Sequence, residues 1–146
     1  MATLNTSRTG SGDQARYTAA GVIAENGSYT MTATASATDA LQVFKVGPGA
    51  RILQMWTWTD TATLTYSVGD GAATGRYMTT ASAVLTGWTT GSTVSTVVRN
   101  INVGAGLSYS YSVADTVDIR FDAAGGGATT NIYWTALVAY DQTETI

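Results

Sequence analysis

The sequence predicts an all-β protein, an antiparallel β-sandwich or jelly roll with an extended N-terminal arm. Apolar and polar residues alternate with a period of two along many short segments. Turn residues recur about every 8–12 positions between these segments. No segment carries the 3.6-residue apolar period of a long helix. We expect about eight or nine short strands, as in other β-sandwiches.

The central segment, residues 41–70, predicts three consecutive strands. Residues 47–50 (GPGA) hold the chain's single proline between two glycines, which is typical of a turn. In the strands on both sides of this turn, the alternation separates side chains that face the core from side chains that face solvent. Five residues are expected to lie buried between the two sheets: Phe44, Leu64, Tyr66, Ile119 and Phe121.

The strand expected at Arg51–Thr59 carries two tryptophans. Regular alternation places Leu53 and Met55 on one face of this strand. Trp56 and Trp58 then share the opposite face.

The remaining elements follow the same two-residue rhythm. Asn26-Gly27 predicts a hairpin between strands at 17–24 and 28–37, because a type I′ turn needs positive φ at both central residues. Residues 131–140 are apolar on both faces, which indicates a central strand or one covered by a partner. Further strands are expected at 94–103, 109–113 and 117–121, with one helical turn at 81–86.

Residues 1–16 form the expected arm, and residues 17–146 form one sandwich domain. The arm is polar and glycine-bearing, so it has little apolar surface to contribute to a core. Leu4 is its apolar anchor, and Arg8 and Arg16 can pair with carboxylates of a partner. We expect these three residues to contact a partner; the alternative is an arm folded back on its own domain.

The composition excludes several chemistries. The 146 residues include no cysteine and no histidine, so nucleophile–histidine and thiolate–metal sites are impossible. A net charge of −3 does not fit a broad nucleic-acid interface, and no apolar run is long enough for a signal peptide or membrane span. We therefore expect no catalytic residue, metal, cofactor, nucleic-acid partner or membrane partner.

Two weaker chemical readings depend on carboxylates. A two-carboxylate glycosidase remains conceivable, but the available aspartates lie in turns or on an outward strand face. The aspartates in question are Asp60, Asp70, Asp115, Asp118 and Asp122. Residues 69–71 (GDG) resemble the start of a calcium loop without its further acidic ligands, so a plain turn is expected.

Only 12% of the residues are charged, whereas about 25% is typical of soluble domains. This low fraction favours a surface covered by neighbours in an assembly; an ordinary acidic β domain is the alternative. Trp56, Trp58 and Trp88 are the candidates for recognition. They could pack in the core, lie in a subunit interface or stack on sugar rings.

The run VFKVGPGARILQMWTWTDTATLTYSVGDGAATGRYM and the later YSVADTVDIRFDAAGGG resemble a family of small structural proteins from tailed bacteriophages. That family carries the patterns F-x-V-P-x-G-A-x-I, tatLsvGDg-x-x-x-Ry and aDTIdi. Gly47 is a departure, because it lengthens the turn by one residue. The resemblance covers about residues 41–122. The matching positions are Phe44, Val46, Pro48, Gly49, Ala50, Ile52, Leu64, Val68, Gly69, Asp70, Gly71, Arg76, Tyr77, Asp115, Thr116 and Asp118.

The resemblance implies a non-enzymatic virion structural protein of jelly-roll type. Such decoration (cement) subunits bind and stabilise the outside of phage capsids, often as trimers. The implied partners are the major capsid protein and further copies of the chain in a homotrimer. The implied location is the capsid surface of the virion, after synthesis in the host cytoplasm. The alternative is a carbohydrate-binding or host-attachment module of a head fibre or tail, acting through Trp56, Trp58 and Trp88.

Overall fold

The computed structural model describes residues 3–5, 21–60, 64–79, 99–100 and 109–140. Every regular element among them is a strand, which confirms the all-β prediction. None of the described residues forms a helix that could cross a membrane. The strands are β1 (Thr3–Asn5), β2 (Gly21–Thr30), β3 (Ala40–Val46), β4 (Ala50–Thr59), β5 (Tyr66–Gly69), β6 (Arg99–Asn100), β7 (Asp115–Phe121) and β8 (Asn131–Tyr140).

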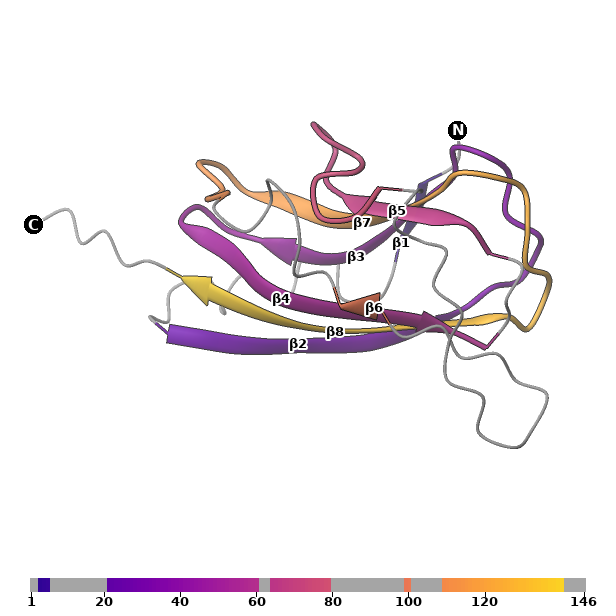
Figure 1. Cartoon of the computed structure of the whole chain (residues 1–146), viewed down its shortest axis with the longest axis horizontal. Coiled ribbons are helices and arrows are strands. Elements are labelled where there is room, and N and C mark those ends of the chain that lie inside the picture. The colour runs from indigo at the N-terminus through magenta and orange to yellow at the C-terminus, as the bar shows by residue number, and fades with distance from the viewer. Residues whose placement is uncertain (1–2, 6–20, 61–63, 80–98, 101–108, 141–146) are drawn as a thin grey trace, which may run out of the picture.

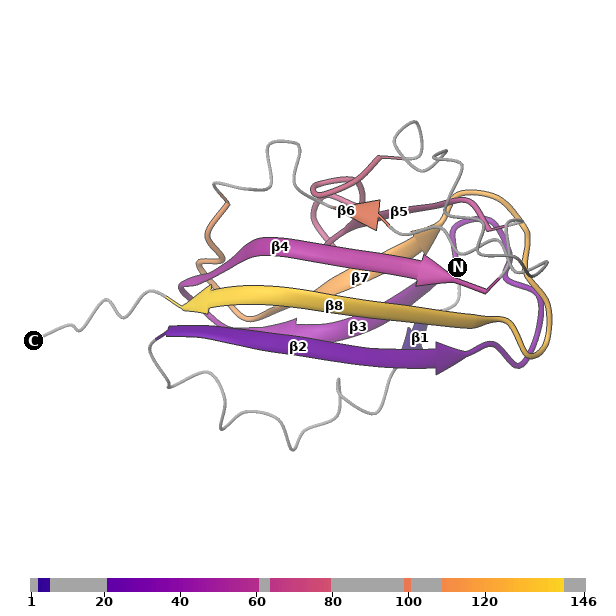
Figure 2. The same cartoon turned by 60° about the horizontal axis from the view of Figure 1, so that its bottom comes forward.

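The strands form two four-stranded sheets that pack face to face (Figure 1). One sheet has the order β1-β3-β7-β5 and the other the order β2-β8-β4-β6. Figure 2 shows β2, β8 and β4 side by side across the second sheet. All pairings are antiparallel except that of β1 with β3. The predicted β-sandwich is confirmed.

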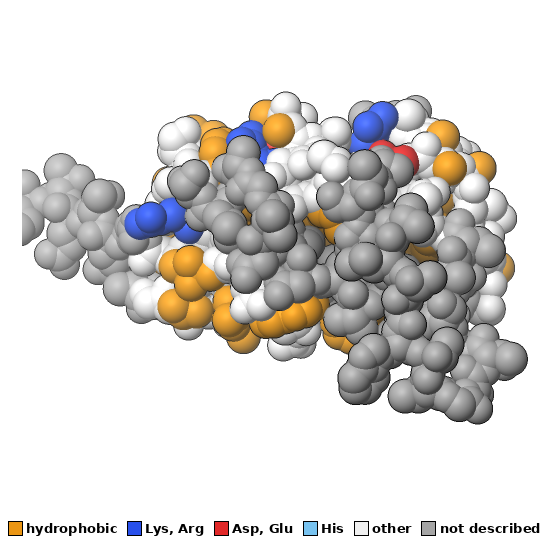
Figure 3. Space-filling model, viewed as in Figure 1, with side chains coloured by type: hydrophobic (Ala, Val, Ile, Leu, Met, Phe, Trp, Pro, Cys, Tyr) orange, Lys and Arg blue, Asp and Glu red, His pale blue; other side chains and the backbone are white. Residues whose placement is uncertain are grey.

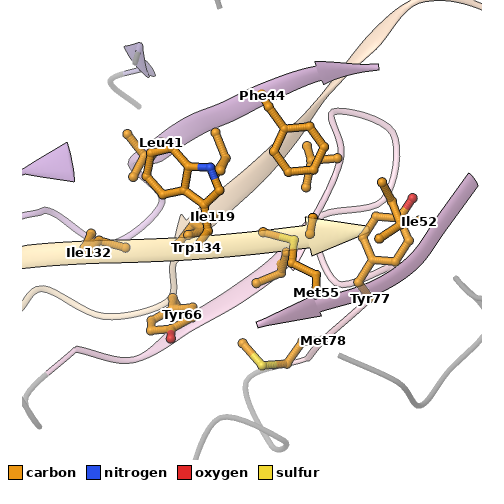
Figure 4. Close-up of a cluster of buried hydrophobic side chains, with 14 of the residues drawn as sticks. Leu41, Phe44, Ile52, Met55, Tyr66, Tyr77, Met78, Ile119, Ile132 and Trp134 are labelled. Atoms are coloured by element: carbon orange, nitrogen blue, oxygen red, sulfur yellow. The ribbon is translucent and has the colours of Figure 1, made fainter. Parts of the chain in front are cut away.

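The buried side chains of both sheets meet between the layers. Trp134 of β8 lies near Leu41 and Ile119 from the opposite sheet (Figure 4). The Thr57 and Tyr66 hydroxyls are 3.1 Å apart and hydrogen-bond across the layers. All five residues expected in the core, namely Phe44, Leu64, Tyr66, Ile119 and Phe121, are buried there.

The hairpin predicted at Asn26-Gly27 is wrong. Strand β2 passes straight through both residues and pairs with β8 from Gly21 opposite Tyr140 to Thr30 opposite Asn131. Gly27 lies opposite Trp134, and a Cβ atom on Gly27 would come within 2.4 Å of the indole Cζ2. The glycine is therefore needed to make room for a ring in a strand and not to allow a turn.

A β-bulge in β3 decides which of its side chains face the core. The ladder with β7 shifts register between Gln42 and Phe44, so the extra residue is Val43. Val43 and Phe44 are both buried, although they are adjacent in the chain. The bulge thereby places Lys45 on the outer face of the sheet, because regular alternation from Gln42 would have placed it inside.

A second bulge, in β4, shifts the register against β8 between Ile52 and Gln54. Met55 is buried, whereas Leu53 is 41% exposed. The expectation that Leu53 and Met55 share a face is therefore wrong, since Leu53 is the extra residue of the bulge. The expectation that Trp56 and Trp58 share a face is confirmed, and this face is the outer one.

The strand expected at 109–113 is also wrong. These residues form no strand, although the Tyr111 backbone bonds with the β3–β4 turn: its amide donates to the Ala50 carbonyl at 2.9 Å, and its carbonyl accepts from the Gly49 amide at 2.7 Å. Tyr111 is buried, whereas Val113 is 66% exposed. The helical turn expected at 81–86 lies outside the described residues, as does most of the strand expected at 94–103.

Part of the expected arm pairs with the chain's own sheet. The backbone of Thr3–Asn5 forms a short parallel ladder with Ala40–Gln42, and Leu4 is the register partner of Leu41. Arg8 and Arg16 lie outside the described residues.

Candidate functional site

The outer face of the sheet β2-β8-β4 collects aromatic and apolar side chains, and we call it the aromatic face. Burial alternates along β4 and β8, so that Trp56 and Trp58 on β4 lie opposite Thr135 and Tyr133 on β8. Within β2, β8 and β4, Arg51 is the single charged residue of this face. Its outward side chains are Val22, Ala24, Asn26, Ser28, Thr30, Arg51, Gln54, Trp56, Trp58, Asn131, Tyr133, Thr135, Leu137 and Ala139.

A stacked aromatic pair lies at one end of the aromatic face. The rings of Trp58 and Tyr133 lie 5.4 Å apart with an interplanar angle of 12°. Both side chains are only partly buried, and Val22, on β2 at the other end of the aromatic face, is 60% exposed. Figure 3 shows hydrophobic side chains along the left and central part of the lower margin of the molecule, where β2 and β8 lie in the same view of Figure 1. This face therefore presents a nearly uncharged surface, in which aromatic and aliphatic side chains alternate with small polar ones, of the kind that interfaces bury.

The outer face of the other sheet is charged, and we call it the charged face. Its outward side chains include Gln42 and Lys45 of β3, and Thr116, Asp118 and Arg120 of β7. The two outer faces of the sandwich thus differ in chemistry: one is aromatic and nearly uncharged, and the other carries charges of both signs.

Burial raises the pKa of Asp118, on the charged face, to about 6. Nearby Asp115 and Asp70 raise it further by repulsion, while a hydrogen bond from the Thr116 side chain lowers it. One carboxylate oxygen, Oδ1, is buried without a hydrogen-bond partner. Asp118 is therefore a carboxylate held in an unfavourable environment at neutral pH.

The Gly-Asp-Gly segment of the phage-protein resemblance forms a closed turn. Asp70 is 0% exposed, and its Oδ1 accepts hydrogen bonds from the amides of Ala72 (3.1 Å) and Ala73 (2.7 Å). Its Oδ2 accepts from Arg76 Nε at 2.5 Å. A Cβ atom at Gly69 would overlap the Ala73 carbonyl oxygen, 2.0 Å away. Asp70 therefore has a structural role in this loop, as the plain-turn reading expects.

Three tyrosines and Arg76 pack around this loop. The Arg76 guanidinium carbon lies 3.5 Å from the centre of the Tyr109 ring, and the hydrogen bond to Asp70 raises the pKa of Arg76. The Tyr77 and Tyr111 hydroxyls hydrogen-bond at 2.8 Å. Burial raises the pKa of Tyr77 to about 12. The cluster attaches the loop to the core.

Two further carboxylates considered for a glycosidase accept hydrogen bonds from neighbouring residues. Asp60 accepts from the Asn131 amide (2.9 Å) and from its side-chain Nδ2 (2.6 Å). Asp122 accepts from the Ser67 hydroxyl at 3.2 Å. No group of three or more acidic residues within the described ranges could hold a metal ion.

The sequence reasoning identified Trp56 and Trp58 but missed Tyr133, which stacks on Trp58. The burial of Trp134 requires Tyr133 to point outward, so alternation along 131–140 contains the necessary signal. Its pairing with Trp58 also depends on the β4 bulge and on the long-range register, which local sequence does not reveal. Trp88 lies outside the described residues.

No protein-family model and no curated protein matches the sequence. Two solved structures share the fold. A chain of the cyanophage Pam1 capsid asymmetric unit is 23% identical with a TM-score of 0.60, over 88% of this chain and 95% of its own length. A chain of the capsid of Ralstonia phage GP4 is 16% identical with a TM-score of 0.65, over 97% of this chain and 100% of its own. At these identities the likeness establishes the fold.

Proposed function

We propose that the chain is a non-enzymatic structural protein of a phage virion, a subunit that decorates and stabilises the capsid. The observation that carries the proposal is the near full-length likeness of fold to chains from two phage capsid structures. The low charged fraction agrees with a surface largely covered by neighbours. The partners are the major capsid protein and further copies of the chain, as a homotrimer on the outer capsid surface.

We assign the aromatic face as a contact surface in the assembly. Interface cores are depleted in charge and enriched in tryptophan, tyrosine and arginine. The aromatic face has this composition, with Trp56, Trp58 and Tyr133 beside the single charge of Arg51. The segment 1–16 forms a second contact, in which Arg8 and Arg16 pair with partner carboxylates beyond the short pairing that contains Leu4.

The mechanism is a shift in the assembly equilibrium. A subunit that binds the assembled shell and not its separated components stabilises the shell by mass action. This needs no chemical step, and it makes the stability of the shell depend on the concentration of the decorating chain.

The strand order supports a jelly roll as the detailed topology. The strand pairs of the sandwich are nested in the sequence. Strand β2 pairs with β8 in one sheet, and β3 and β7, which lie between them in the sequence, pair in the other. This nested pairing across two sheets is what two Greek keys of a jelly roll produce.

Co-sedimentation with purified capsids of the source phage, prepared without the chain, tests the proposal. We expect saturable binding to assembled shells, none to dissociated shell protein, and a higher melting temperature of decorated shells. Absence of binding to intact shells would contradict the proposal.

A second candidate function follows from the Trp58–Tyr133 stack. Exposed aromatic rings on a sheet face can stack on sugar rings, so the aromatic face could hold a glycan as part of a head fibre or tail. Binding of the isolated chain to a glycan array, lost on replacing Trp56 or Trp58 by alanine, would favour this function over decoration.

A further inference from the structure

Asn26 and Gly27 form the dipeptide in which asparagine deamidates most readily, and the chain contains this dipeptide once. Every other asparagine of the chain is followed by threonine, isoleucine or valine. In this reaction the backbone nitrogen of the following residue attacks the side-chain carbonyl carbon of asparagine. A following glycine leaves the approach open because it has no Cβ atom, whereas a branched Cβ hinders it.

The ladder between β2 and β8 holds this dipeptide in an unreactive geometry. The register is unbroken along β2, and just beyond its end the Met31 amide donates to the Thr130 carbonyl at 2.8 Å. Because the amides of an antiparallel strand face a given partner at every second residue, this bond places the Gly27 amide on the side of β8. The side chain of Asn26 stands roughly perpendicular to the sheet. The nitrogen and the carbon that must meet therefore point in different directions.

The side chain of Asn26 is itself free to react. It is exposed on the outer side of β2, and its carboxamide has no hydrogen-bond partner among the described residues. The reactive neighbour cannot be exchanged for a slower one, because a Cβ atom on Gly27 would lie 2.4 Å from Cζ2 of Trp134. The core thus requires the glycine, and the backbone of the strand restrains the reaction.

Strand β2 is weakly attached to the rest of the sandwich. It lies at the margin of its sheet (Figure 2), and within the described residues it pairs with β8 alone. None of its ten residues belongs to the buried hydrophobic core, and only Ile23 and Tyr29 pack partly buried against that core. Elements with few buried apolar contacts open at a lower free energy than the whole domain. Release of β2 is therefore the opening that frees Asn26.

We propose that Asn26 is a self-modification site that the fold restrains, and that release of β2 from β8 lets it convert to aspartate or isoaspartate. On release, the Gly27 nitrogen gives up its proton to solvent and bonds to Cγ of Asn26. The bond between Cγ and the side-chain nitrogen breaks, and that nitrogen takes up a proton and leaves as ammonia. Water then opens the resulting succinimide ring at either carbonyl carbon. Water is the only co-reactant.

Both products place a carboxylate on the aromatic face. Asn26 shares a row across the sheet with Thr135 and Trp56, whereas Arg51 lies in the row of Val22. The two rows are about 13 Å apart along the strands, at the usual rise per residue, so the new charge has no opposite charge beside it within β2, β8 and β4. Isoaspartate also adds one atom to the backbone, which disturbs the ladder with β8.

Rates of deamidation in the folded and the unfolded chain give the direct test. The full chain is incubated in mildly alkaline buffer, with and without urea above its unfolding transition. Peptide mapping by mass spectrometry measures conversion at each asparagine, and an isoaspartate methyltransferase assay measures isoaspartate. We expect Asn26 to convert faster than the other asparagines in urea, and at least about tenfold more slowly in the folded chain. Equal rates with and without urea, or no conversion of Asn26 in urea, would overturn the proposal.

Two matched substitutions test whether conversion passes through release of β2. Ile23 packs partly buried against the core, whereas its neighbour Val22 is 60% exposed. Ile23→Ala should raise the rate at Asn26 in the folded chain about tenfold, because it weakens the attachment of β2, and Val22→Ala should leave this rate unchanged. Equal rates in the two variants mean that release of β2 is not the route, and the proposal is then wrong. If Ile23→Ala does not fold, Ile23→Val replaces it.

The effect on assembly rests on the proposed function. Asn26→Asp carries the charge of the product, and Asn26→Gln keeps an uncharged amide on a side chain too long for the succinimide ring. We expect Asn26→Asp to bind capsids at least about tenfold more weakly than Asn26→Gln, since an unpaired carboxylate is then buried in the contact. If the wild-type chain does not bind capsids, the proposed function fails and the deamidation results stand. If wild type binds and the two variants bind alike, the effect on assembly is overturned.

Discussion

Replacing Asp118 by asparagine should change the pH dependence of stability. The carboxyl group has a pKa of about 6 in the folded protein, compared with 3.8 for the unperturbed group. A raised acid pKa means that the folded state holds the proton more tightly than the unfolded state. The stability that this proton contributes is complete below pH 3.8 and is lost as the pH rises through about 6.

The magnitude follows from the size of the shift. A difference of one in pKa corresponds to about 1.4 kcal/mol, so the full shift would give roughly 3 kcal/mol for a wholly buried group. Asp118 is only partly buried, and solvent screening reduces this to about 1–2 kcal/mol. We expect the free energy of unfolding of Asp118→Asn, taken relative to that of wild type, to rise by this amount from pH 4 to pH 7.5.

Urea unfolding of both proteins at the two pH values measures the effect. Asparagine itself alters local hydrogen bonding, so the informative quantity is the change with pH in the difference between variant and wild type. Asp122→Asn removes a neighbouring carboxylate and controls for the loss of one negative charge. A difference between Asp118→Asn and wild type that is the same at pH 4 and pH 7.5 would refute the assignment of a buried, raised-pKa carboxyl.

Three further substitutions test separate parts of the structure. Gly27→Ala should lower the free energy of unfolding by about 1–3 kcal/mol in urea titrations, because the added methyl group overlaps the Trp134 ring. Arg76→Met should cost about 3–5 kcal/mol in the same assay, since it leaves the buried Asp70 carboxylate without its ion pair. Trp58→Ala should weaken capsid co-sedimentation by about tenfold or more while unfolding changes little, as for an interface residue.

Matched controls make the first two results specific, and the third has its own contradicting outcome. Ser28→Ala, on the outer side of β2 beside Gly27, should change unfolding by less than about 0.5 kcal/mol. Arg120→Met should also have a small effect on unfolding, because its contact with Asp122 is 4.0 Å long and partly exposed. If Trp58→Ala unfolds far more easily and binds capsids normally, the aromatic face is a packing surface and not an interface.

Local alternation predicted the fold class and five core residues correctly, because inward and outward side chains of a strand differ in hydropathy over a few residues. The two bulges were not predictable in this way. Each adds one residue whose effect is visible only against the partner strand, and each reverses the faces of the residues that follow it. The buried position of Met55 beside the exposed Leu53 depends on the bulge in β4.

Gly27 illustrates the same limit for turns. Asparagine followed by glycine is a strong local signal for a hairpin, and local sequence contains nothing against it. The competing requirement comes from Trp134, more than a hundred positions later, which needs a residue without a Cβ atom opposite it. The shared face of Trp56 and Trp58 could be predicted from the sequence. The surroundings of Lys45 could not, because they are formed by β3 and β7, which are distant in the sequence.

The position of β8 has a consequence for how the protein folds. This strand lies between β2 and β4 and pairs with both along nearly its full length, yet it comes after them and after every other described strand in the sequence. The sheet of β2, β8 and β4 cannot form until residues 131–140 have left the ribosome. Until then, β2 and β4 have unpaired edges and exposed apolar side chains, a condition that promotes aggregation in nascent chains. Folding should therefore be slow, as expected when most strand pairings join distant residues.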